Sequence, residues 1–289
     1  MLMHQAPAKV NVGLAIQRKR PDGYHDIATL FLKISLVDTL SFEIIPRQIV
    51  VECDHPEVPS DAQNLVYRAA ALLQSCVPGY GVHIHLQKAI PVAAGLGGGS
   101  SDAAATLLGL NALWDLRLSS AELRQYGAQL GADVPFFLLP TNAALGVGRG
   151  DELEPMSCPW EFFLVLVTPP LAVSTAWVYQ HFRFELTQTP NNTNILKQHL
   201  ESGDIASLGG VLFNDLETVV LPRFPVVQEV KRALRQPGVV GVSMSGSGPS
   251  VYALCLSQEV AQEVSGVVAQ RGWQVWMCHP WRETTPKLA

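Results

Sequence analysis

Charged residues are scarce in this chain. They make up 16% of its 289 residues, whereas hydrophobic residues make up 48%. This composition excludes an intrinsically disordered protein, and a chain of this length can bury a core without disulfides or metal ions. The net charge is −5 and the sequence pI is about 5.9. Because no basic stripe offsets this acidic balance, we expect no nucleic-acid partner.

The sequence also lacks CxxC cysteine pairs and long apolar runs. The spacing of the cysteines indicates neither a zinc site nor a disulfide framework, and it favours a reducing compartment. The apolar run at 162–167 is far shorter than the ~20 residues needed to cross a bilayer. The first residues lack the basic start of a secretory signal. We therefore expect a cytoplasmic protein with no membrane partner. The five cysteines are Cys53, Cys76, Cys158, Cys255 and Cys278.

An alternation of apolar with small or polar residues predicts a strand at the N-terminus. Lys9 and Asn11 project from the same face of this strand, about 7 Å apart by strand rise. The face that carries them is small and polar, as a cleft wall would be. The apolar face holds Val10, Val12, Leu14 and Ile16, and the other face holds Lys9, Asn11, Gly13 and Ala15.

Periodicity and turn residues predict strands and helices in both halves of the chain, which indicates the α/β or α+β class. Ser119 and Glu122 form a capping box for one helix. A turn-rich stretch at 146–151, followed by Pro155 and Pro159, marks the expected boundary between domains 1–156 and 157–289. Strands are expected at 40–45, 49–53, 81–87, 162–167 and 274–278, with a strand–loop–strand at 239–256. Helices are expected at 63–75, 101–114, 119–130, 194–200, 226–234 and 258–270.

A glycine-rich run at 95–102 (GLGGGSSD) precedes the helix expected at 101–114 and carries the strongest chemical signal. Four glycines in five positions free the backbone to turn its amides inward, and a helix N-terminus adds unpaired N–H groups. Together they predict an anion site suited to phosphates. The run is not a Walker A motif, a Rossmann fingerprint or a nucleophile elbow, because it lacks a residue that each of these motifs requires. A second loop at 243–249 (SMSGSGP) is a weak signal by itself. Together with the first loop, it is interpreted as another wall of a nucleotide site.

Three motifs in order resemble those of the GHMP kinases: 7–11 (PAKVN), 91–104 (PVAAGLGGGSSDAA) and 244–249 (MSGSGP). The segments 20–25 (RPDGYH) and 131–136 (GADVPF) are similar to those of the members that act on diphosphocytidyl-methylerythritol in the non-mevalonate isoprenoid pathway. This resemblance spans the chain. It implies an α+β fold of two domains with the active site in the cleft between them. The N-terminal domain would bind ATP, and the C-terminal domain would be ferredoxin-like.

The resemblance also implies a reaction, in which ATP phosphorylates the 2-hydroxyl of the methylerythritol part of a cytidine diphosphate conjugate. Asp133 would be the general base, and Lys9 its charge partner. By position alone, Asp133 would more often cap the turn after a helix. Mg²⁺ is expected with ATP, but the sequence identifies no ligand for it. The ATP-binding residues would be Asn64, Pro91, Val92, Ala93, Ala94, Gly95, Leu96, Gly97, Gly98, Gly99, Ser100 and Ser101.

The cytosine would be recognised near the turn at 20–25. Tyr179 would stack on the pyrimidine, although Trp177 and Phe182 make an ordinary aromatic helix face the alternative. Asn64 could equally be a helix-start residue. His83 and His85 share a strand face and are interpreted as surface rather than as a metal site. The substrate-binding residues would be Asn11, Tyr24, His25, Phe31, Tyr179, Gly246, Ser247 and Gly248.

Two other functions stay open at this point. One is another GHMP kinase, acting on homoserine, mevalonate or a sugar. The other is a non-catalytic RNA-binding protein, because the family's N-terminal domain resembles ribosomal and translation-factor folds. The acidic balance and the presence of both Lys9 and Asp133 argue against RNA binding. The expected partner is a small molecule, and the chain would be a monomer or a homodimer.

Overall fold

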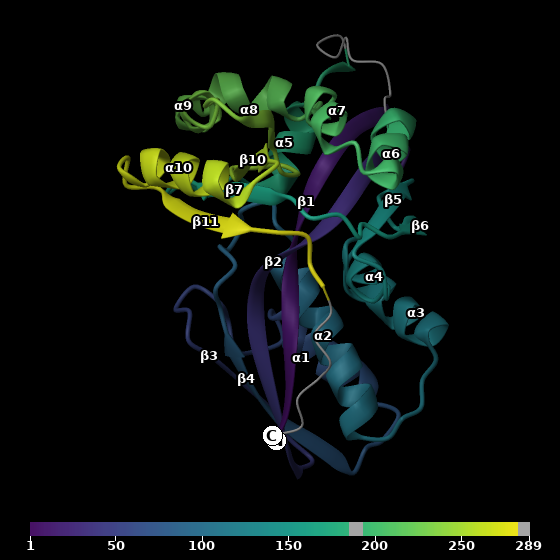
Figure 1. The fold of residues 1–289 in the computed structure, drawn as a ribbon. Coiled ribbons are helices and arrows are strands. Elements are labelled where there is room, and N and C mark those ends of the chain that lie inside the picture. Colours follow the sequence, from purple (N-terminus) through teal and green to yellow (C-terminus); the bar gives the residue numbers. More distant parts are fainter. Residues whose placement is uncertain (185–192, 283–289) are drawn as a thin grey trace.

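Two β-sheets organise the computed structural model, which describes residues 1–184 and 193–282 (Figure 1). Strands β1 and β2 are long and pair antiparallel through most of their length. The first sheet has the order β3-β4-β2-β1-β8, and β5 pairs with both β2 and β6. Its strands are β1 (Leu2–Lys19), β2 (His25–Pro46), β3 (Ile49–Cys53), β4 (Tyr80–Gln87), β5 (Ala143–Val147), β6 (Glu152–Met156) and β8 (Phe213–Asn214).

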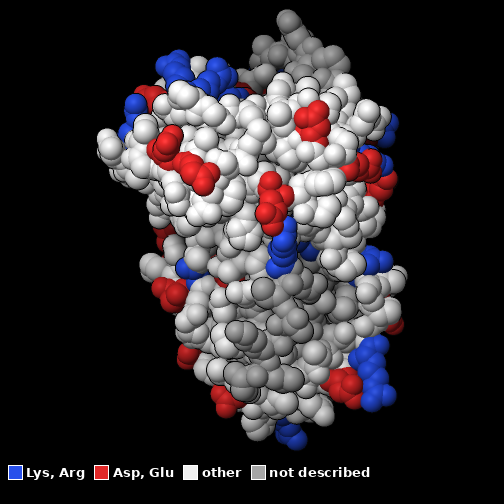
Figure 2. Space-filling model, in the orientation of Figure 1, with Lys and Arg blue, Asp and Glu red and all other residues white. Residues whose placement is uncertain are grey.

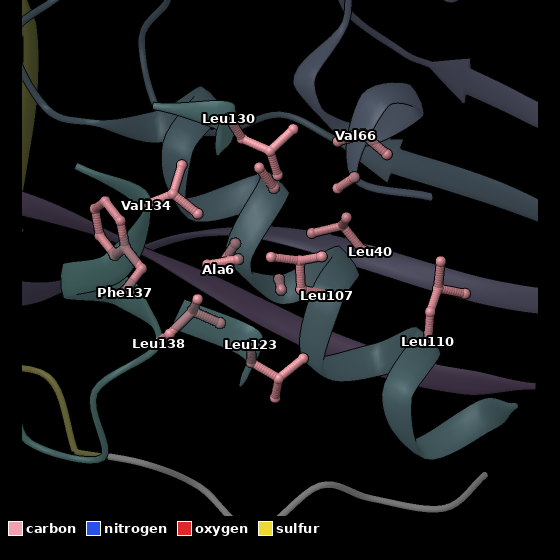
Figure 3. Close-up of a cluster of buried hydrophobic side chains, with 14 of the residues drawn as sticks. Ala6, Leu40, Val66, Leu107, Leu110, Leu123, Leu130, Val134, Phe137 and Leu138 are labelled. Carbon is pink, nitrogen blue, oxygen red and sulfur yellow. The ribbon is translucent and has the colours of Figure 1, made fainter. Parts of the chain in front are cut away.

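Four helices pack on the first sheet and bury its principal core. The Ala-rich helix α2 lies at the centre and contacts α1, α3, α4 and strand β1. Figure 3 shows side chains from these helices and from β1 and β2 meeting around Leu107. The predicted capping box closes the start of α3, where Ser119 and Glu122 bond each other's backbone. The helices are α1 (Leu65–Gln74), α2 (Gly98–Leu113), α3 (Ser120–Leu130) and α4 (Val134–Phe137).

The second sheet is antiparallel, with the order β11-β7-β10-β9, and helices cover it in the upper part of Figure 1. Its buried strand β10 pairs with β7 on one side and β9 on the other. The strands are β7 (Phe163–Thr168), β9 (Val239–Met244), β10 (Val251–Cys255) and β11 (Gln274–Cys278). The helices of this half are α5 (Thr175–His181), α6 (Thr193–Ser202), α7 (Ile205–Gly210), α8 (Glu217–Arg223), α9 (Pro225–Ala233) and α10 (Gln258–Ala269).

The predicted mixed class is confirmed, and each predicted element overlaps an observed one. The strand expected at 40–45 is only the end of β2, which begins at His25. Two expectations need correction. The turn-rich stretch at 146–151, expected to mark the domain boundary, is the end of β5 and the turn of the β5–β6 hairpin within the first sheet, because β5 pairs with β6 across it. Helix α2 begins at Gly98 rather than near Ser101, since the glycines themselves form its first turn. The domain limit at 156/157 stays a prediction.

The surface carries both signs of charge. On the face in Figure 2, acidic and basic side chains are interspersed over the described residues. Among residues 1–184 and 193–282, no helix has the length and apolar character needed to span a membrane.

Candidate active site

A cleft of about 990 Å³ is lined by both halves of the chain. Strands β1 and β2 form its floor, the loop before α2 forms one side, and the loop between β9 and β10 together with α5 forms another. The three motifs that the sequence singled out therefore converge, although the first begins at residue 7 and the last ends at residue 249.

Lys9 and Asp133 meet in this cleft. Lys9 Nζ lies 3.8 Å from Asp133 Oδ2. The ammonium also donates to Asn11 Oδ1 at 2.6 Å and to the Gly95 carbonyl at 3.2 Å. Asp133 stands at the N-cap position of α4, but its side chain makes no capping hydrogen bond. Its carboxylate is therefore available to the cleft, which argues against a mere capping role.

The two members of this pair differ in exposure. Lys9 is 4% exposed, whereas the Asp133 side chain is 35% exposed and can reach a bound molecule. Burial lowers the pKa of the Lys9 ammonium, and the negative charge of Asp133 opposes that shift. Lys9 Nζ also lies 5.5 Å from the centre of the Phe31 ring, so an aromatic face supports it from below.

A β-bulge changes which residues of β1 face the cleft. The register of β1 against β2 slips between Asn11 and Gly13. Beyond the slip, Leu14 lines the cleft, and Gly13 faces Leu196 and Phe213 instead. The expectation that Gly13 and Ala15 continue the face of Lys9 and Asn11 is therefore wrong, because one extra residue reverses the alternation.

The glycine loop has the backbone geometry that its sequence predicts. Gly95 and Gly97 have φ of +77° and +71°, in the left-handed region that favours glycine. A Cβ on Gly95 would lie 2.2 Å from the Ser245 carbonyl oxygen, so only glycine allows the two loops to touch. Gly97 is the N-cap of α2. The helix therefore begins with its free N–H groups at the cleft, as phosphate binding requires.

The third loop is fastened to the other two motifs. Ser245 Oγ donates to the Gly95 carbonyl at 2.9 Å and accepts from the Asn11 N–H at 3.3 Å. Asn214, at the end of β8, donates through Nδ2 to the carbonyls of Met244 and Gly246, each at 2.8 Å. Sequence reasoning missed Asn214. Nothing in a single buried Asn signals that it holds this loop through two of its carbonyls.

Most of the predicted nucleotide residues line the cleft, from Pro91 to Ser100 without a break. Ser101 is different, because it lines a second cavity on another side of α2. Asn64 lines the cleft, but its side chain caps α1 by accepting from the Val66 N–H, and it donates to Pro59. The helix-start explanation therefore accounts for the hydrogen bonds that Asn64 makes.

The predicted cytosine residues gather in the same cleft. The His25 and Tyr179 rings lie 5.5 Å apart, one from β2 and the other from α5. His25 Nδ1 is buried without a hydrogen-bond partner in the described part of the chain. Burial, helped by the Lys19 charge, lowers the pKa of His25, so its imidazole is neutral at neutral pH. Tyr24 is 60% exposed at the rim, with the Arg149 guanidinium 5.6 Å from its ring centre.

The other predicted substrate residues differ in their access to the cleft. Phe31 is buried beneath Lys9 and stacks on Phe136, with ring centres 4.9 Å apart. Gly246 and Ser247 line the cleft, and Ser247 Oγ is hydrogen-bonded to Thr175 Oγ1 at 2.8 Å. Gly248 is outside the set of cleft-lining residues, and its N–H donates to the Ser245 carbonyl.

Sequence reasoning also missed a buried charge cluster at the nucleotide end. Lys88 donates to Asp102 Oδ2 at 2.7 Å and to Asp38 Oδ2, and both Lys88 and Asp102 line the cleft. The one available signal was the Asp that ends the glycine–serine run. Nothing in the sequence pointed to its partners, because Asp38 lies 64 residues away on β2.

Metal-ligand clusters are absent from the described ranges 1–184 and 193–282, where no three His, Cys, Asp or Glu side chains gather as ligands. His83 lies on β4 with its Nε2 3.3 Å from Glu52 Oε2. His83 and His85 are both half-buried on that strand, and neither lines the cleft.

Comparison with known proteins gives consistent similarities. The profile of the GHMP kinases N terminal domain matches residues 64–140, and that of the GHMP kinases C terminal matches residues 196–272. A 4-diphosphocytidyl-2-C-methyl-D-erythritol kinase of Synechococcus sp. (strain JA-2-3B'a(2-13)) is 46% identical over 270 residues, which cover 89% of this chain and 86% of that protein.

Solved structures of kinases are also similar to this chain. A crystal structure of a 4-(cytidine 5'-diphospho)-2C-methyl-D-erythritol kinase superposes with a TM-score of 0.82 at 37% identity, over 97% of this chain and all (100%) of that one. A homoserine kinase from Cytophaga hutchinsonii ATCC 33406 has a TM-score of 0.72 at 20% identity, over 97% of this chain and 94% of that one. At that identity, the second likeness concerns the fold alone.

Proposed function

Because the chain belongs to the GHMP kinase family, within its group of 4-diphosphocytidyl-2-C-methyl-D-erythritol kinases, we propose that it transfers the γ-phosphoryl group of ATP to the 2-hydroxyl of that substrate. The reaction would serve isoprenoid precursor biosynthesis. The observation that carries this proposal is the Lys9–Asp133 pair, 3.8 Å apart in a cleft that the glycine loop also lines.

Asp133 would act as the general base. Phosphoryl transfer to an alcohol needs an acceptor for the hydroxyl proton, a cradle for the phosphates and positive charge near the transferred group. The Asp133 carboxylate has no capping bond and is exposed to the cleft, so a substrate hydroxyl can approach it. Proton transfer to Asp133 would accompany attack of the substrate oxygen on the γ-phosphorus.

Lys9 would supply the positive charge. Its hydrogen bonds to Asn11 and Gly95 fix the ammonium at one end of the glycine loop. Asn11 is itself held, because its Nδ2 donates to Thr29 Oγ1 at 2.7 Å. An ammonium with its position fixed before substrate binds stabilises developing phosphate charge without reorganisation.

ATP would lie with its phosphates on the glycine loop and at the start of α2. Mg²⁺ is proposed as its companion and would neutralise phosphate charge when bound. Kinases usually hold this ion by one or two carboxylates together with the phosphates themselves. A cleft lined by separate carboxylates, without a three-ligand cage in the described residues, fits that arrangement. No residue of this chain is assigned as a ligand.

The cytosine would be bound between His25 and Tyr179. A neutral imidazole offers one donor and one acceptor, and the buried Nδ1 of His25 has no partner within the described chain. Tyr179, which lines the cleft 5.5 Å from that ring, would stack on the base. His25, Tyr179, Lys9 and Asp133 all line this one cleft, so the diphosphate and the sugar of a bound substrate would lie between the base and the catalytic pair.

A substrate panel tests the proposal. Purified enzyme with ATP and Mg²⁺ is assayed for ADP release with the cytidine diphosphate conjugate, mevalonate and homoserine. We expect turnover with the first substrate, and kcat/KM at least ~10³-fold lower with the others, because both lack the base and the diphosphate. Equal or better turnover of mevalonate or homoserine would refute the proposed substrate. The likeness to the homoserine kinase concerns the fold only and does not favour that alternative.

A further inference from the structure

A buried cluster of one ammonium and two carboxylates adjoins the start of α2. Lys88 Nζ donates to Asp38 Oδ2 and, at 2.7 Å, to Asp102 Oδ2. The three side chains are 5%, 0% and 3% exposed, for Lys88, Asp38 and Asp102 in that order. None of them belongs to the Lys9–Asp133 pair, so the proposed reaction has not yet assigned them a role.

The cluster joins the first sheet to the glycine loop. Asp38 lies on β2, and its Oδ1 accepts from the N–H groups of Ala89 and Ile90 at 2.6 and 2.8 Å. Asp102 lies just after the first turn of α2. A Cβ placed on Gly98 would lie 3.4 Å from Lys88 Nζ, so the ammonium is against the first residue of that helix. Lys88 therefore adds positive charge where the helix N-terminus already attracts phosphate.

The charge of the cluster depends on one proton. With both carboxylates ionised its net charge is −1, which opposes a polyphosphate. In that state Asp102 Oδ1 is also buried without a hydrogen-bond partner in the described chain, an arrangement that costs free energy. A proton on Asp102 makes the cluster neutral, and the carboxyl group can then donate a hydrogen bond to the neighbouring Asp38 carboxylate.

The surroundings favour that proton. Burial raises the pKa of Asp102 to about 8, the Lys88 charge opposes the shift, and Asp38 adds to it through its charge and a hydrogen bond. Other ionisable groups nearby are Cys53 and Asp54 at the end of β3, where Asp54 Oδ1 accepts from the Lys88 N–H at 2.9 Å. Lys9 is the other ammonium at this loop, where it contacts Gly97 and donates to the Gly95 carbonyl.

We propose that Asp102 is a positioning residue of the nucleotide site that works as a neutral acid. Protonated, it holds Lys88 against the start of α2 in a neutral cluster, so that no net negative charge opposes the attraction of the helix N-terminus for the phosphates. The inference rests on the nucleotide site of the proposed function and adds a residue to it. It concerns nucleotide binding alone and is independent of which alcohol is phosphorylated.

Nucleotide binding is then linked to proton uptake. Phosphate anions near the cluster disfavour the ionised carboxylate, so the pKa of Asp102 is higher in the complex than in the free enzyme. Affinity is fully present below the free-enzyme pKa of about 8 and is lost as the pH rises above it. The loss should reach roughly three- to tenfold between pH 7 and pH 9, with uptake of at most one proton per nucleotide.

Isothermal titration of the whole enzyme with ADP tests this. It is run in EDTA from pH 6.5 to 9.5, in two buffers that differ in ionisation enthalpy, so that affinity and proton uptake are both measured. Asp102→Asn keeps the shape and the hydrogen bond but cannot titrate. Its affinity for ADP at pH 7 should lie within about twofold of wild type. Between pH 7 and pH 9 it should lose less affinity than wild type does, because the part of the loss that comes from ionisation of Asp102 is absent. Asp102→Ala should bind ADP roughly tenfold more weakly at every pH, because Lys88 loses a partner.

A matched control isolates the buried carboxyl. Asp54 also contacts Lys88, but it is exposed, so Asp54→Asn should follow the wild-type pH profile. Changes in the protonation of ADP and of Lys9 with pH are the same in wild type and in the three variants, so they cancel when the pH profiles are compared. Equal pH profiles in wild type and Asp102→Asn would overturn the proposal. So would an Asn variant as weak as the Ala variant at pH 7, because the carboxylate ion would then be the form required.

A second arm separates proton binding from metal binding. If Mg²⁺ strengthens ADP binding to wild type but not to Asp102→Asn, Asp102 is a metal ligand and the proposal is wrong. We expect Mg²⁺ to act equally on both proteins. Failure of wild type to bind ADP at pH 7 would instead refute the nucleotide site, and with it the proposed function.

Discussion

Replacing Gly97 by alanine should damage both the fold and the chemistry by amounts that follow from the backbone. Gly97 has φ of +71°, and a left-handed conformation costs a residue with a Cβ ~1–2 kcal/mol. The new Cβ would lie 3.0 Å from the Phe137 ring and 3.1 Å from Lys9 Cγ, so both side chains must move by a few tenths of an ångström. We expect Tm to fall by about 2–6 °C.

The kinetic effect of Gly97→Ala should exceed its effect on stability. Lys9 carries the ammonium proposed to stabilise the transferred phosphoryl group, and small displacements of such groups are costly. We expect kcat to fall roughly tenfold or more. Thermal unfolding and steady-state kinetics, with ATP and the cytidine substrate varied in turn, measure the two effects.

Gly99→Ala is the matched control for stability. Gly99 lies in the first turn of α2 and lacks a positive φ, and its Cβ would meet only Leu65 Cδ1, at an ordinary 3.8 Å. Alanine is favoured over glycine in a helix by ~1 kcal/mol, so Tm should stay level or rise. The reasoning is refuted if Gly97→Ala is as stable and active as wild type, or if both variants lose the same stability.

Three further predictions concern the two ends of the cleft. Asp133→Asn and Lys9→Met should each lower kcat by ~10²–10⁴, and the double variant should lose much less than the product of the two, because the residues act as a unit; a fully multiplicative loss would mean separate roles. Burial lowers the pKa of Lys9 from the ordinary lysine value of 10.5, and Lys9 is charged only below its own pKa, so the rate should begin to fall at an alkaline pH that is lower than 10.5. Arginine stays charged to higher pH, so an active Lys9→Arg variant should keep its rate to higher pH than wild type; an unchanged alkaline limb of the pH–rate profile would mean that another group causes the fall. Tyr179→Ala should raise KM for cytidine and uridine conjugates alike, since stacking tolerates any base, whereas His25→Ala should raise KM mainly for the cytidine conjugate, by the ~1–3 kcal/mol of a lost buried hydrogen bond; equal effects of His25→Ala on both conjugates would remove His25 as the reader of the base.

Local sequence signals predicted many of the elements of the fold, although they gave no sign of β5, β6 and β8. The capping box at Ser119 predicted the start of α3, and the glycine run predicted a turn with left-handed residues beside a helix. Short helices in the second half were harder. Helix α8, for example, contains Pro222, which a propensity argument counts against a helix. Its buried face packs in the core of the second half, and that tertiary packing outweighs propensity.

The candidate site was predictable where one motif carries it and unpredictable where distant residues meet. Lys9 was identified from the resemblance of its motif, and its strand face was expected to be a cleft wall. The bulge after Asn11, which turns Leu14 into the cleft, leaves no mark in the alternation. Asp102 shows the same limit. Its role depends on Lys88 and Asp38, two residues brought to it by the sheet, and only the folded chain brings the three together.

The most direct test of the central claim is to follow the reaction of ATP with 4-diphosphocytidyl-2-C-methyl-D-erythritol by phosphorus NMR, using wild type and Asp133→Asn side by side. For wild type we predict one new phosphomonoester on the 2-oxygen of the methylerythritol part, formed one-to-one with ADP. Asp133→Asn should bind ATP with wild-type affinity and form that product ~10²–10⁴-fold more slowly. A phosphate on another oxygen, no product with wild type, or an undiminished rate with Asp133→Asn would contradict the account.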